Sequence, residues 1–397
     1  MNFIIIPNIT GTITAAGSAM RLRDKPLNTF FKDKIILITG AAGSVGQELI
    51  RLLLACAPGE IRAVDNNETA LFLLGERYRH TNGLTFFFGD VRDARKMENL
   101  CAGVDIIFHA AALKHVGLSE YNPFEAVQTN ILGVKNIIQA AICQKVKRTI
   151  FTSSDKAVNP TNVMGTSKLM GERLMSAANI VNPGGQQVFS SVRFGNVIAS
   201  QGSVVPIFAD QIRRGASVTI TDIKMTRFFM TLQEAAHLVL EACTLACGGE
   251  VFVTKMPVMR ILDLAQAMID LLAPIYGFDP QDIAIEFIGA RSGEKLYEEL
   301  LSDEEIDRTT ELQRMFVILP ALRNFYTRIK YAYRDAGARP ARRSYISSRE
   351  EPLTVAEIKT YLIRHKVLRE FMPSFPDAAF TSENFLTGEP SQLAAAH

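Results

Sequence analysis

Two side chains of opposite charge stand next to each other at Asp155 and Lys156, directly after a short β-branched run. A carboxyl group and an amine held close together can supply a general acid and a general base to one substrate. A second lysine, Lys168, follows four residues after Met164, and this spacing places the two side chains on one face of a helix. The pattern predicts proton-transfer chemistry here; the alternative is an ordinary surface ion pair.

A glycine-rich segment, TGAAGSVG, lies between a β-branched run and a helical pattern at residues 39–46. Glycines at such a turn let the backbone approach a pyrophosphate, and the helix that follows offers its N-terminal N–H groups. The spacing is GxxGxxG, which is a weak signal alone and a strong one between a strand and a helix. We therefore expect dinucleotide contacts from Gly40, Gly43, Ser44, Val45 and Gly46.

Two acidic residues end the next two β-branched runs. Asp65 is placed to accept hydrogen bonds from an adenosine ribose and to repel a 2′-phosphate, and Asn66 and Asn67 supply no cation for one. This favours NAD over NADP, although Asp65 as a plain turn or cap residue is the alternative. Asp90, followed by Val91, is expected either at the adenine or in an Asx-turn.

Short apolar runs alternate with helical patterns, which predicts an α/β fold with a doubly wound parallel sheet buried on both faces. Ligands of such sheets bind beyond the carboxyl ends of the strands, which is where residues 154–156 fall. The predicted strands are residues 35–39, 61–65, 84–90, 105–109, 149–154 and 190–194, and two of the helices are residues 46–56 and 123–143.

The alternation of strand and helix patterns becomes less regular after residue 196, which indicates a second, smaller α/β domain. The polar, basic stretch at residues 337–352 reads as a linker, and Thr354 with Glu357 forms a capping box ahead of a final helix. The predicted division is an N-terminal arm at 1–30, a Rossmann-like domain at 31–195, a substrate-binding region at 196–335 with a strand near 250–255 that could return to the sheet, and a linker, helix and tail at 336–397.

Composition excludes several classes of protein. The 43 Lys and Arg residues balance 41 Asp and Glu residues to a net charge of +2, so no general basic field attracts nucleic acid. Five scattered cysteines make neither a disulfide framework nor a zinc site, so no metal is expected and a reducing cytoplasm is favoured. Pro7 interrupts the apolar N-terminal run, and no later stretch is long enough to span a membrane.

The chain resembles the extended short-chain dehydrogenase/reductases, in which a Ser or Thr precedes a Tyr-x-x-x-Lys motif. Lys168 fits the family lysine, while Met164 occupies the tyrosine position and has no proton to exchange. One branch, the nucleotide-sugar 4,6-dehydratases of capsule, O-antigen and protein-glycan biosynthesis, includes members with this methionine. The resemblance runs from about residue 21 to residue 301 through SSDKAVNPTNVMG, AAALKHV, RFGNV, GSVVP, MTRFFM and GEKL, with Ser154 in place of the usual threonine.

The resemblance implies a reaction in which NAD⁺ takes hydride from C4 of a nucleotide-linked hexose, water leaves across C5–C6, and hydride returns to C6. It implies that Asp155 is the acid, Lys156 the base, and Lys168 the holder of the nicotinamide ribose. Ser154 would assist at O4 or only cap a turn, with a water in place of the tyrosine beside Met164. Lys156 must act neutral, and we expect burial, Lys168 and the nicotinamide cation to lower its pKa. Ala110 and Ala111 would join the cofactor contacts.

Substrate contacts follow from the same matching segments. Lys114 and His115 would border the sugar, and Asn130 would bind a backbone carbonyl or water, or be a buried structural amide. Arg193 is either a diphosphate ligand or a structural arginine. The remaining substrate residues implied are Asn196, Val204, Arg227, Arg291 and Glu294.

The leading hypothesis is a cytoplasmic, soluble, NAD-dependent 4,6-dehydratase of a UDP-N-acetylhexosamine, most of all UDP-GlcNAc, with Met164 favouring retention at C5. The alternatives are a nucleotide-sugar 4-epimerase, which is expected to keep the tyrosine, and a non-catalytic NAD-binding sensor. A homo-oligomer is expected through the long, fairly apolar helices at residues 123–143 and 164–178.

Overall fold

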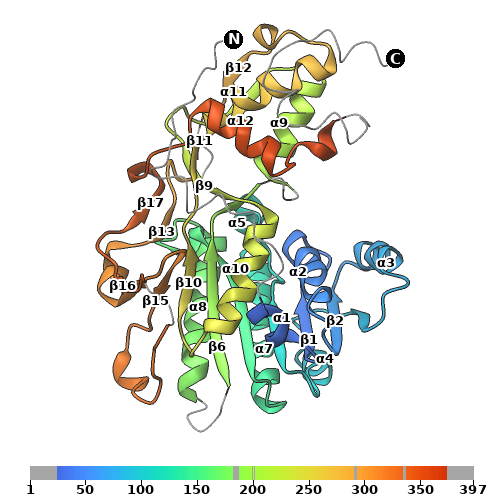
Figure 1. The fold of residues 1–397 in the computed structure, drawn as a ribbon, viewed down its shortest axis with the longest axis vertical. Coiled ribbons are helices and arrows are strands. Elements are labelled where there is room, and N and C mark those ends of the chain that lie inside the picture. Colours follow the sequence, from blue (N-terminus) through green and yellow to red (C-terminus); the bar gives the residue numbers. More distant parts are fainter. Residues whose placement is uncertain are drawn as a thin grey trace, which may run out of the picture.

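The computed structural model describes residues 25–181, 187–198, 200, 202–289, 293–333 and 337–372. These residues form two lobes, a larger one built on a ten-stranded sheet and a smaller one above it (Figure 1). No helix among the described residues has both the length and the apolar character needed to cross a membrane.

The central sheet has the strand order β16-β14-β15-β10-β6-β5-β4-β1-β2-β3. All neighbours from β3 to β10 pair in parallel, while β15, β14 and β16 extend the edge in antiparallel fashion. This confirms the predicted doubly wound α/β fold. The parallel strands are β1 (Ile35–Thr39), β2 (Glu60–Asp65), β3 (Leu84–Phe88), β4 (Ile106–His109), β5 (Arg148–Ser154), β6 (Val188–Phe194) and β10 (Val251–Thr254).

Helices cover both faces of this sheet, which explains why its strands read as continuous apolar runs. On one face Ile50 and Val239 are fully buried against the sheet, and on the other Ile137 and Met175 are. The first face carries α1 (Lys25–Phe31), α2 (Ser44–Leu54), α3 (Glu68–Arg77) and α10 (Leu232–Leu245), and the second α4 (Ala94–Leu100), α7 (Gly133–Cys143) and α8 (Val163–Val181).

The smaller lobe has its own core, in which Leu264, Met268 and Leu362 are fully buried. Its final helix begins at the predicted capping box, where Thr354 and Glu357 bond each other's backbone. The lobe contains α9 (Val204–Arg213), α11 (Ile261–Leu272), α12 (Val355–Arg364), the strand pair β8 (Val218–Ile220) and β12 (Ile285–Phe287), and the sheet of β7 (Asn196–Val197), β9 (Thr226–Met230) and β11 (Val258–Arg260).

The predicted division of the chain differs from the structure at both ends. Within the expected arm, residues 25–30 belong to α1, whose Phe31 is fully buried; residues 1–24 lie outside the described part. The expected linker is partly sheet, because residues 339–340 and 345–346 pair with strands. β16 (Arg339–Pro340) pairs with β14 (Thr309–Glu311), which also pairs with β15 (Met315–Ile318), and β17 (Tyr345–Ile346) pairs with β13 (Glu299–Leu301). Strands this short, paired with distant segments, leave no periodicity to find.

The helix predicted at residues 123–143 is interrupted. A short α6 (Pro123–Ala126) leads into a π-helical turn, η2 (Val127–Leu132), before α7 begins. The π turn holds Asn130, whose amide bonds both backbone groups of Leu113, at 2.8 and 2.9 Å. Such turns are frequent at functional sites.

Candidate active site

A cavity of about 720 Å³ opens at the carboxyl ends of β1, β2, β4 and β5. Its volume falls within the range of small-molecule sites. Its wall includes all of the residues predicted to contact the cofactor, namely Gly40, Gly43, Ser44, Val45, Gly46, Asp65, Asp90, Val91, Ala110, Ala111 and Lys168. Ser154, Lys156, Met164, Lys114 and His115 line it as well.

The glycine loop leaves no room for side chains. Gly40 has a φ of +69°, and a Cβ there would lie 2.6 Å from the backbone nitrogen of Ala111. A Cβ on Gly46 would lie 2.2 Å from the carbonyl oxygen of Gly40. The bare backbone and the start of α2 at Ser44 therefore face the cavity together, which is the arrangement that a pyrophosphate requires.

Two carboxylates, Asp65 and Asp90, line the cavity where β2 and β3 end. Asp65 accepts hydrogen bonds from the backbone of Ala42 and Asn67, each at 2.9 Å. Asp90 forms the Asx-turn, because its Oδ1 accepts from the backbone nitrogen of Arg92 at 2.9 Å, and it also lines the cavity. Burial would raise the pKa of Asp90, but its bonds from Arg92 lower it overall.

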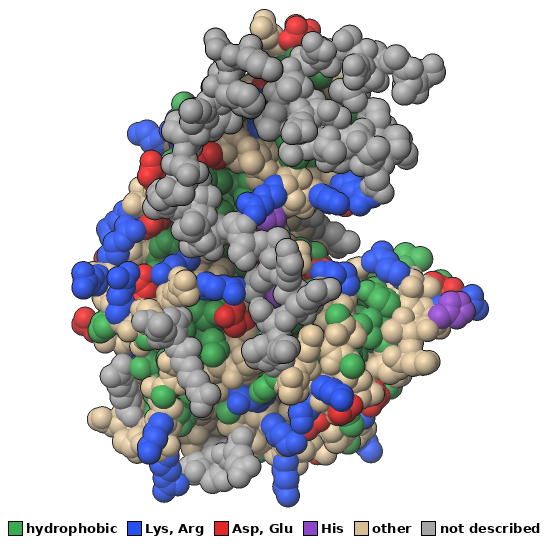
Figure 2. Space-filling model, viewed as in Figure 1, with side chains coloured by type: hydrophobic (Ala, Val, Ile, Leu, Met, Phe, Trp, Pro, Cys, Tyr) green, Lys and Arg blue, Asp and Glu red, His purple; other side chains and the backbone are tan. Residues whose placement is uncertain are grey.

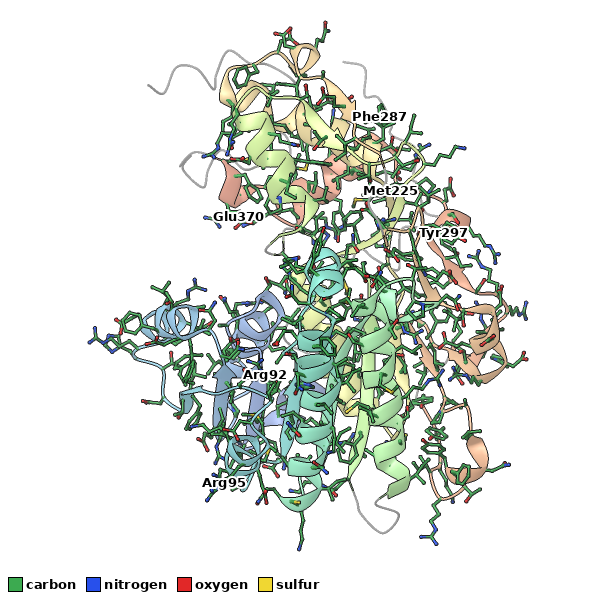
Figure 3. All side chains as sticks on the ribbon, turned by 180° about the vertical axis from the view of Figure 1, so that it is seen from behind. Arg92, Arg95, Met225, Phe287, Tyr297 and Glu370 are labelled. Carbon is green, nitrogen blue, oxygen red and sulfur yellow. The ribbon has the colours of Figure 1, made fainter. Side chains whose placement is uncertain are left out.

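One cation in this wall was not predicted from the sequence. Arg92, labelled in Figure 3, lies 2.7 Å from Asp90 and 2.9 Å from Glu125. Its charge is matched by these two carboxylates, so it does not turn the wall into a site for a 2′-phosphate.

Local hydrogen bonds fix the positions of Asp155 and Lys156. Strand β5 ends at Ser154, and a 3₁₀ turn, η3 (Asp155–Ala157), follows at once. The hydroxyl of Ser154 accepts from the backbone nitrogen of Lys156 and donates to Oδ1 of Asp155 at 2.7 Å, so Ser154 does cap a turn. The same Oδ1 lies 3.0 Å from Nζ of Lys156. Gly165 allows α8 to pack closely here, since a Cβ would lie 2.2 Å from the Lys156 carbonyl oxygen.

Lys168 lies below the cavity on α8, buried to 5% exposure. Its Nζ donates to the carbonyl of Thr152 at 2.9 Å and sits 4.7 Å from the ring centre of Phe151. Burial lowers the pKa of Lys168 to about 8. Met164, one turn earlier, is 3% exposed and presents a thioether to the cavity.

Glu298, which sequence reasoning missed, completes the charged cluster. It is 2% exposed, and its Oε1 lies 3.3 Å from Nζ of Lys156 and 3.6 Å from Nε of Arg227. Glu298 follows the matching GEKL segment by two residues, but nothing in the sequence links it to a lysine so far away in the chain. Tyr297, the residue before it, is labelled near the junction of the lobes in Figure 3.

The pKa of Lys156 shifts in the direction opposite to the one expected. Burial does act to lower the pKa of Lys156, but the charges of Asp155 and Glu298 outweigh it and raise the pKa above its ordinary value. Burial raises the pKa of Glu298. Lys156 is therefore an ammonium ion in this state, and it must lose a proton before it can serve as a base.

Three predicted substrate residues form hydrogen bonds or ion pairs with other groups of the protein. The guanidinium of Arg227 is 4% exposed and donates to the backbone carbonyls of residues 226, 295 and 296. Asn130 donates to the backbone carbonyl of Leu113, as expected, and to Ser167, each at 2.9 Å, and it is also the buried amide of the alternative. Arg193 is the structural arginine, held between Glu172 at 2.7 Å and Glu305 at 2.9 Å.

Three further predicted substrate residues do not line this cavity. Asn196, Val204 and Glu294 lie near the junction with the smaller lobe, outside the lining of the cavity. Glu294 is 3.9 Å from Arg227. Arg291 lies outside the described residues.

A larger cavity, of about 1490 Å³, opens between the lobes on the α2 and α10 side. Figure 2 shows this hollow with basic side chains along its rim. Of the predicted site residues it contains only Ser44, whereas the expected cofactor residues and Lys156 line the smaller cavity; Asp155 is fully buried and lines neither.

Comparisons with known proteins identify the family of this chain. The model of the polysaccharide biosynthesis protein family matches residues 36–320. A Methanocaldococcus jannaschii protein described as an uncharacterized membrane protein is 51% identical over 294 residues, covering 74% of this chain and 88% of its own. The inverting UDP-N-acetylglucosamine 4,6-dehydratase of Campylobacter jejuni is 39% identical over 295 residues, covering 74% and 85%.

Other relatives differ in length or activity. The UDP-glucose 4-epimerase of Rickettsia conorii is 37% identical over 347 residues, covering 86% of this chain and 98% of its own. The chain spans 46% of the Staphylococcus aureus capsular polysaccharide biosynthesis protein CapD, at 44% identity over 282 residues. The X-ray structure of Pen from Bacillus thuringiensis matches with a TM-score of 0.79 at 40% identity, covering 85% of this chain and 99% of that one.

Proposed function

This chain belongs to the polysaccharide biosynthesis protein family, and we propose that it is an NAD-dependent nucleotide-sugar 4,6-dehydratase acting on a UDP-N-acetylhexosamine, most of all UDP-GlcNAc. The observation that carries the proposal is the Asp155–Lys156 pair, held 3.0 Å apart at the end of β5. An elimination across C5–C6 needs a base at C5 and an acid at the 6-hydroxyl, whereas oxidation and re-reduction at C4 need only a group that accepts and returns the O4 proton.

The cavity suits NAD. The open backbone of the glycine loop would hold the pyrophosphate, Asp65 would accept from the adenosine ribose, and Lys168 would hold the nicotinamide ribose. Once bound, NAD⁺ would accept a hydride from the sugar and return it later. Extraction of the nucleotide from purified protein tests this, since recovery of NADP⁺ would contradict the role given to Asp65.

The protein's own groups then carry the protons. Lys156, once neutral, would remove the proton at C5, and Asp155 would protonate the departing 6-hydroxyl. Ser154, already bonded to Asp155, would connect that carboxyl to the sugar's O4 through its hydroxyl. Lys114 and His115, which line the cavity, would border the sugar.

A nucleotide-sugar 4-epimerase is the second candidate, because the Rickettsia conorii relative with that activity is matched over 98% of its length. The same cofactor loop would serve it. Met164 and the Asp155–Lys156 pair favour the dehydratase, since epimerisation expels no 6-hydroxyl and gives this pair no role, and an epimerase is expected to keep the tyrosine that Met164 replaces.

One incubation separates these candidates. Purified protein is mixed with UDP-GlcNAc, and the nucleotide sugar is analysed by mass spectrometry and chromatography. A product lighter by one water supports the dehydratase, an isomer of unchanged mass supports the epimerase, and unchanged substrate supports a non-catalytic NAD-binding protein. The configuration at C5 of a dehydrated product, formed in deuterated water, decides between retention, which Met164 favours, and inversion.

A further inference from the structure

Two buried carboxylates flank Lys156 instead of one. Nζ of Lys156 lies 3.0 Å from Oδ1 of Asp155 and 3.3 Å from Oε1 of Glu298. The second oxygen of each carboxylate is buried and accepts no hydrogen bond from any described residue. A bare ionised oxygen in a dry site is costly, so such an oxygen is a favourable place for a proton.

The position of Glu298 is fixed independently of Lys156. Its backbone N–H donates to Oγ of Ser347 at 2.9 Å, and its carbonyl accepts from the Ser347 N–H at 2.9 Å. The charged groups that face the pair are Asp155 on η3, Arg227 on β9 and, beyond Arg227, the partly exposed Glu294. Two cations and two buried carboxylates therefore share one small volume.

The charge balance explains why a second carboxylate matters. Asp155 and Glu298 hold Lys156 as an ammonium ion, which cannot remove a proton. Asp155 accepts a hydrogen bond from Ser154 and already has a proposed role at the leaving hydroxyl. Glu298 has no such role, and its burial favours the neutral, protonated carboxyl. The proton on Lys156 thus has a second place to reside 3.3 Å away.

We propose that Glu298 is a positioning residue that takes the proton of Lys156 when substrate enters, leaving Lys156 as the neutral amine that removes the C5 proton. This rests on the proposed dehydratase function. In the first step an N–H bond of Lys156 breaks and an O–H bond forms at Glu298. The C5 proton then moves to Lys156 and is later returned to C5. Transfer from Glu298 back to Lys156 restores the resting pair.

The proposal has a consequence for pH. Transfer from Lys156 to Glu298 leaves the number of protons on the pair unchanged, so the fraction of neutral Lys156 does not vary with pH while the pair holds one proton. In Glu298→Gln, Lys156 must lose its proton to solvent, and its neutral fraction rises about tenfold per pH unit. Dividing the rate of the unmodified protein by the rate of Glu298→Gln cancels the effect of any group that titrates in both proteins, including Lys168.

The experiment measures deuterium incorporation at C5 from deuterated water, with UDP-GlcNAc, between about pH 6 and about pH 8. The ratio of the unmodified rate to the Glu298→Gln rate should fall about tenfold per pH unit. Glu298→Asp, which keeps the carboxyl, should restore the pH profile of the unmodified protein. Glu299→Gln is the matched control, because Glu299 pairs with Asn159 and Lys295 and not with Lys156.

Three outcomes would overturn the proposal. A ratio that stays constant with pH would show that Glu298 takes no proton. A Glu298→Asp protein that does not share the pH profile of the unmodified protein would show the same, even if Glu298→Gln did not fold. An unmodified protein that forms no dehydrated product would refute the dehydratase function, and this inference with it.

Discussion

Nζ of Lys156 lies 3.3 Å from Oε1 of Glu298, although the two residues are far apart in the sequence. The contact brings the segment after β5 against the segment before β13 and buries both charges at the junction of the two lobes. It makes Lys156 an ammonium ion at rest, so the base of the proposed reaction exists only after a proton has moved.

Replacing Lys156 by Ala should remove the base and leave the rest of the site in place. NAD⁺ and UDP-sugar should still bind, because Lys168, Asp65 and the glycine loop are unchanged. Turnover should fall by about 10²–10⁴-fold, and solvent deuterium should no longer enter C5. Lys147→Ala, a change at a largely exposed lysine, is the control. Full activity in Lys156→Ala, together with a complete loss in Met164→Leu, would mean that the roles are wrongly assigned.

Asp155→Asn should separate proton removal from water loss. The amide keeps the shape of the side chain but cannot deliver a proton to the 6-hydroxyl. The variant should still exchange the C5 proton while releasing little dehydrated product, as measured by mass spectrometry on the same sample. Equal loss of exchange and of product would argue against a separate acid.

Lys168 should make stability depend on pH. Its pKa is about 8 when folded, whereas a free lysine titrates near 10.4, so the unfolded chain binds more protons between these values. The free energy of unfolding should therefore carry a contribution from Lys168 that rises with pH across this window. At pH values below this window Lys168 is charged in both states, and burial of the ammonium ion lowers the free energy of unfolding by its full amount.

Lys168→Met should remove that cost. At pH 7 the variant should gain roughly 2 kcal/mol in urea unfolding while losing NAD affinity, and the gain should vanish above about pH 10.4. A variant that is less stable than the unmodified protein at pH 7 would contradict the direction of this shift.

Arg193→Met should test the structural role that the fold gives this arginine. It leaves Glu172 and Glu305 buried and without their main cation, so unfolding free energy should fall by about 3–5 kcal/mol. Arg213→Ala breaks an exposed pair and should change stability by less than about 0.5 kcal/mol. If Arg193→Met kept its stability and lost only substrate affinity, Arg193 would instead be a ligand of the substrate diphosphate.

An oligomer should form through the helices on the outer side of the site. Exposed apolar side chains gather on α5 (Val116–Tyr121), α6, η2 and α8, which pack side by side. They are Leu118, Tyr121, Phe124, Leu132 and Met170. Light scattering should give a mass above that of one chain, and Phe124→Asp should lower it, whereas Phe72→Asp on α3 should not. A sharp monomer mass at micromolar concentration would count against the proposal.

Local signals in the sequence predicted the larger part of the cofactor site. Gly40, Gly46 and Asp65 could be placed because a strand, a tight turn and a helix follow one another within a short stretch, and each step has its own residue preference. Asp155, Lys156 and Lys168 were placed for the same reason, since β5 and α8 are neighbours in the chain. The parallel sheet then brings these strand ends to one edge.

What only the tertiary structure decided is which charges meet across long distances in the chain. Arg193 and Arg227 look alike as cations in matching segments, yet burial against Glu172 and Glu305 makes one structural, and backbone carbonyls hold the other beside Glu298. The protonation of Lys156 depends on Glu298, a partner that no local pattern marks. A pKa responds to the charges and water around a group in space, and sequence spacing fixes those only within a helix or a turn.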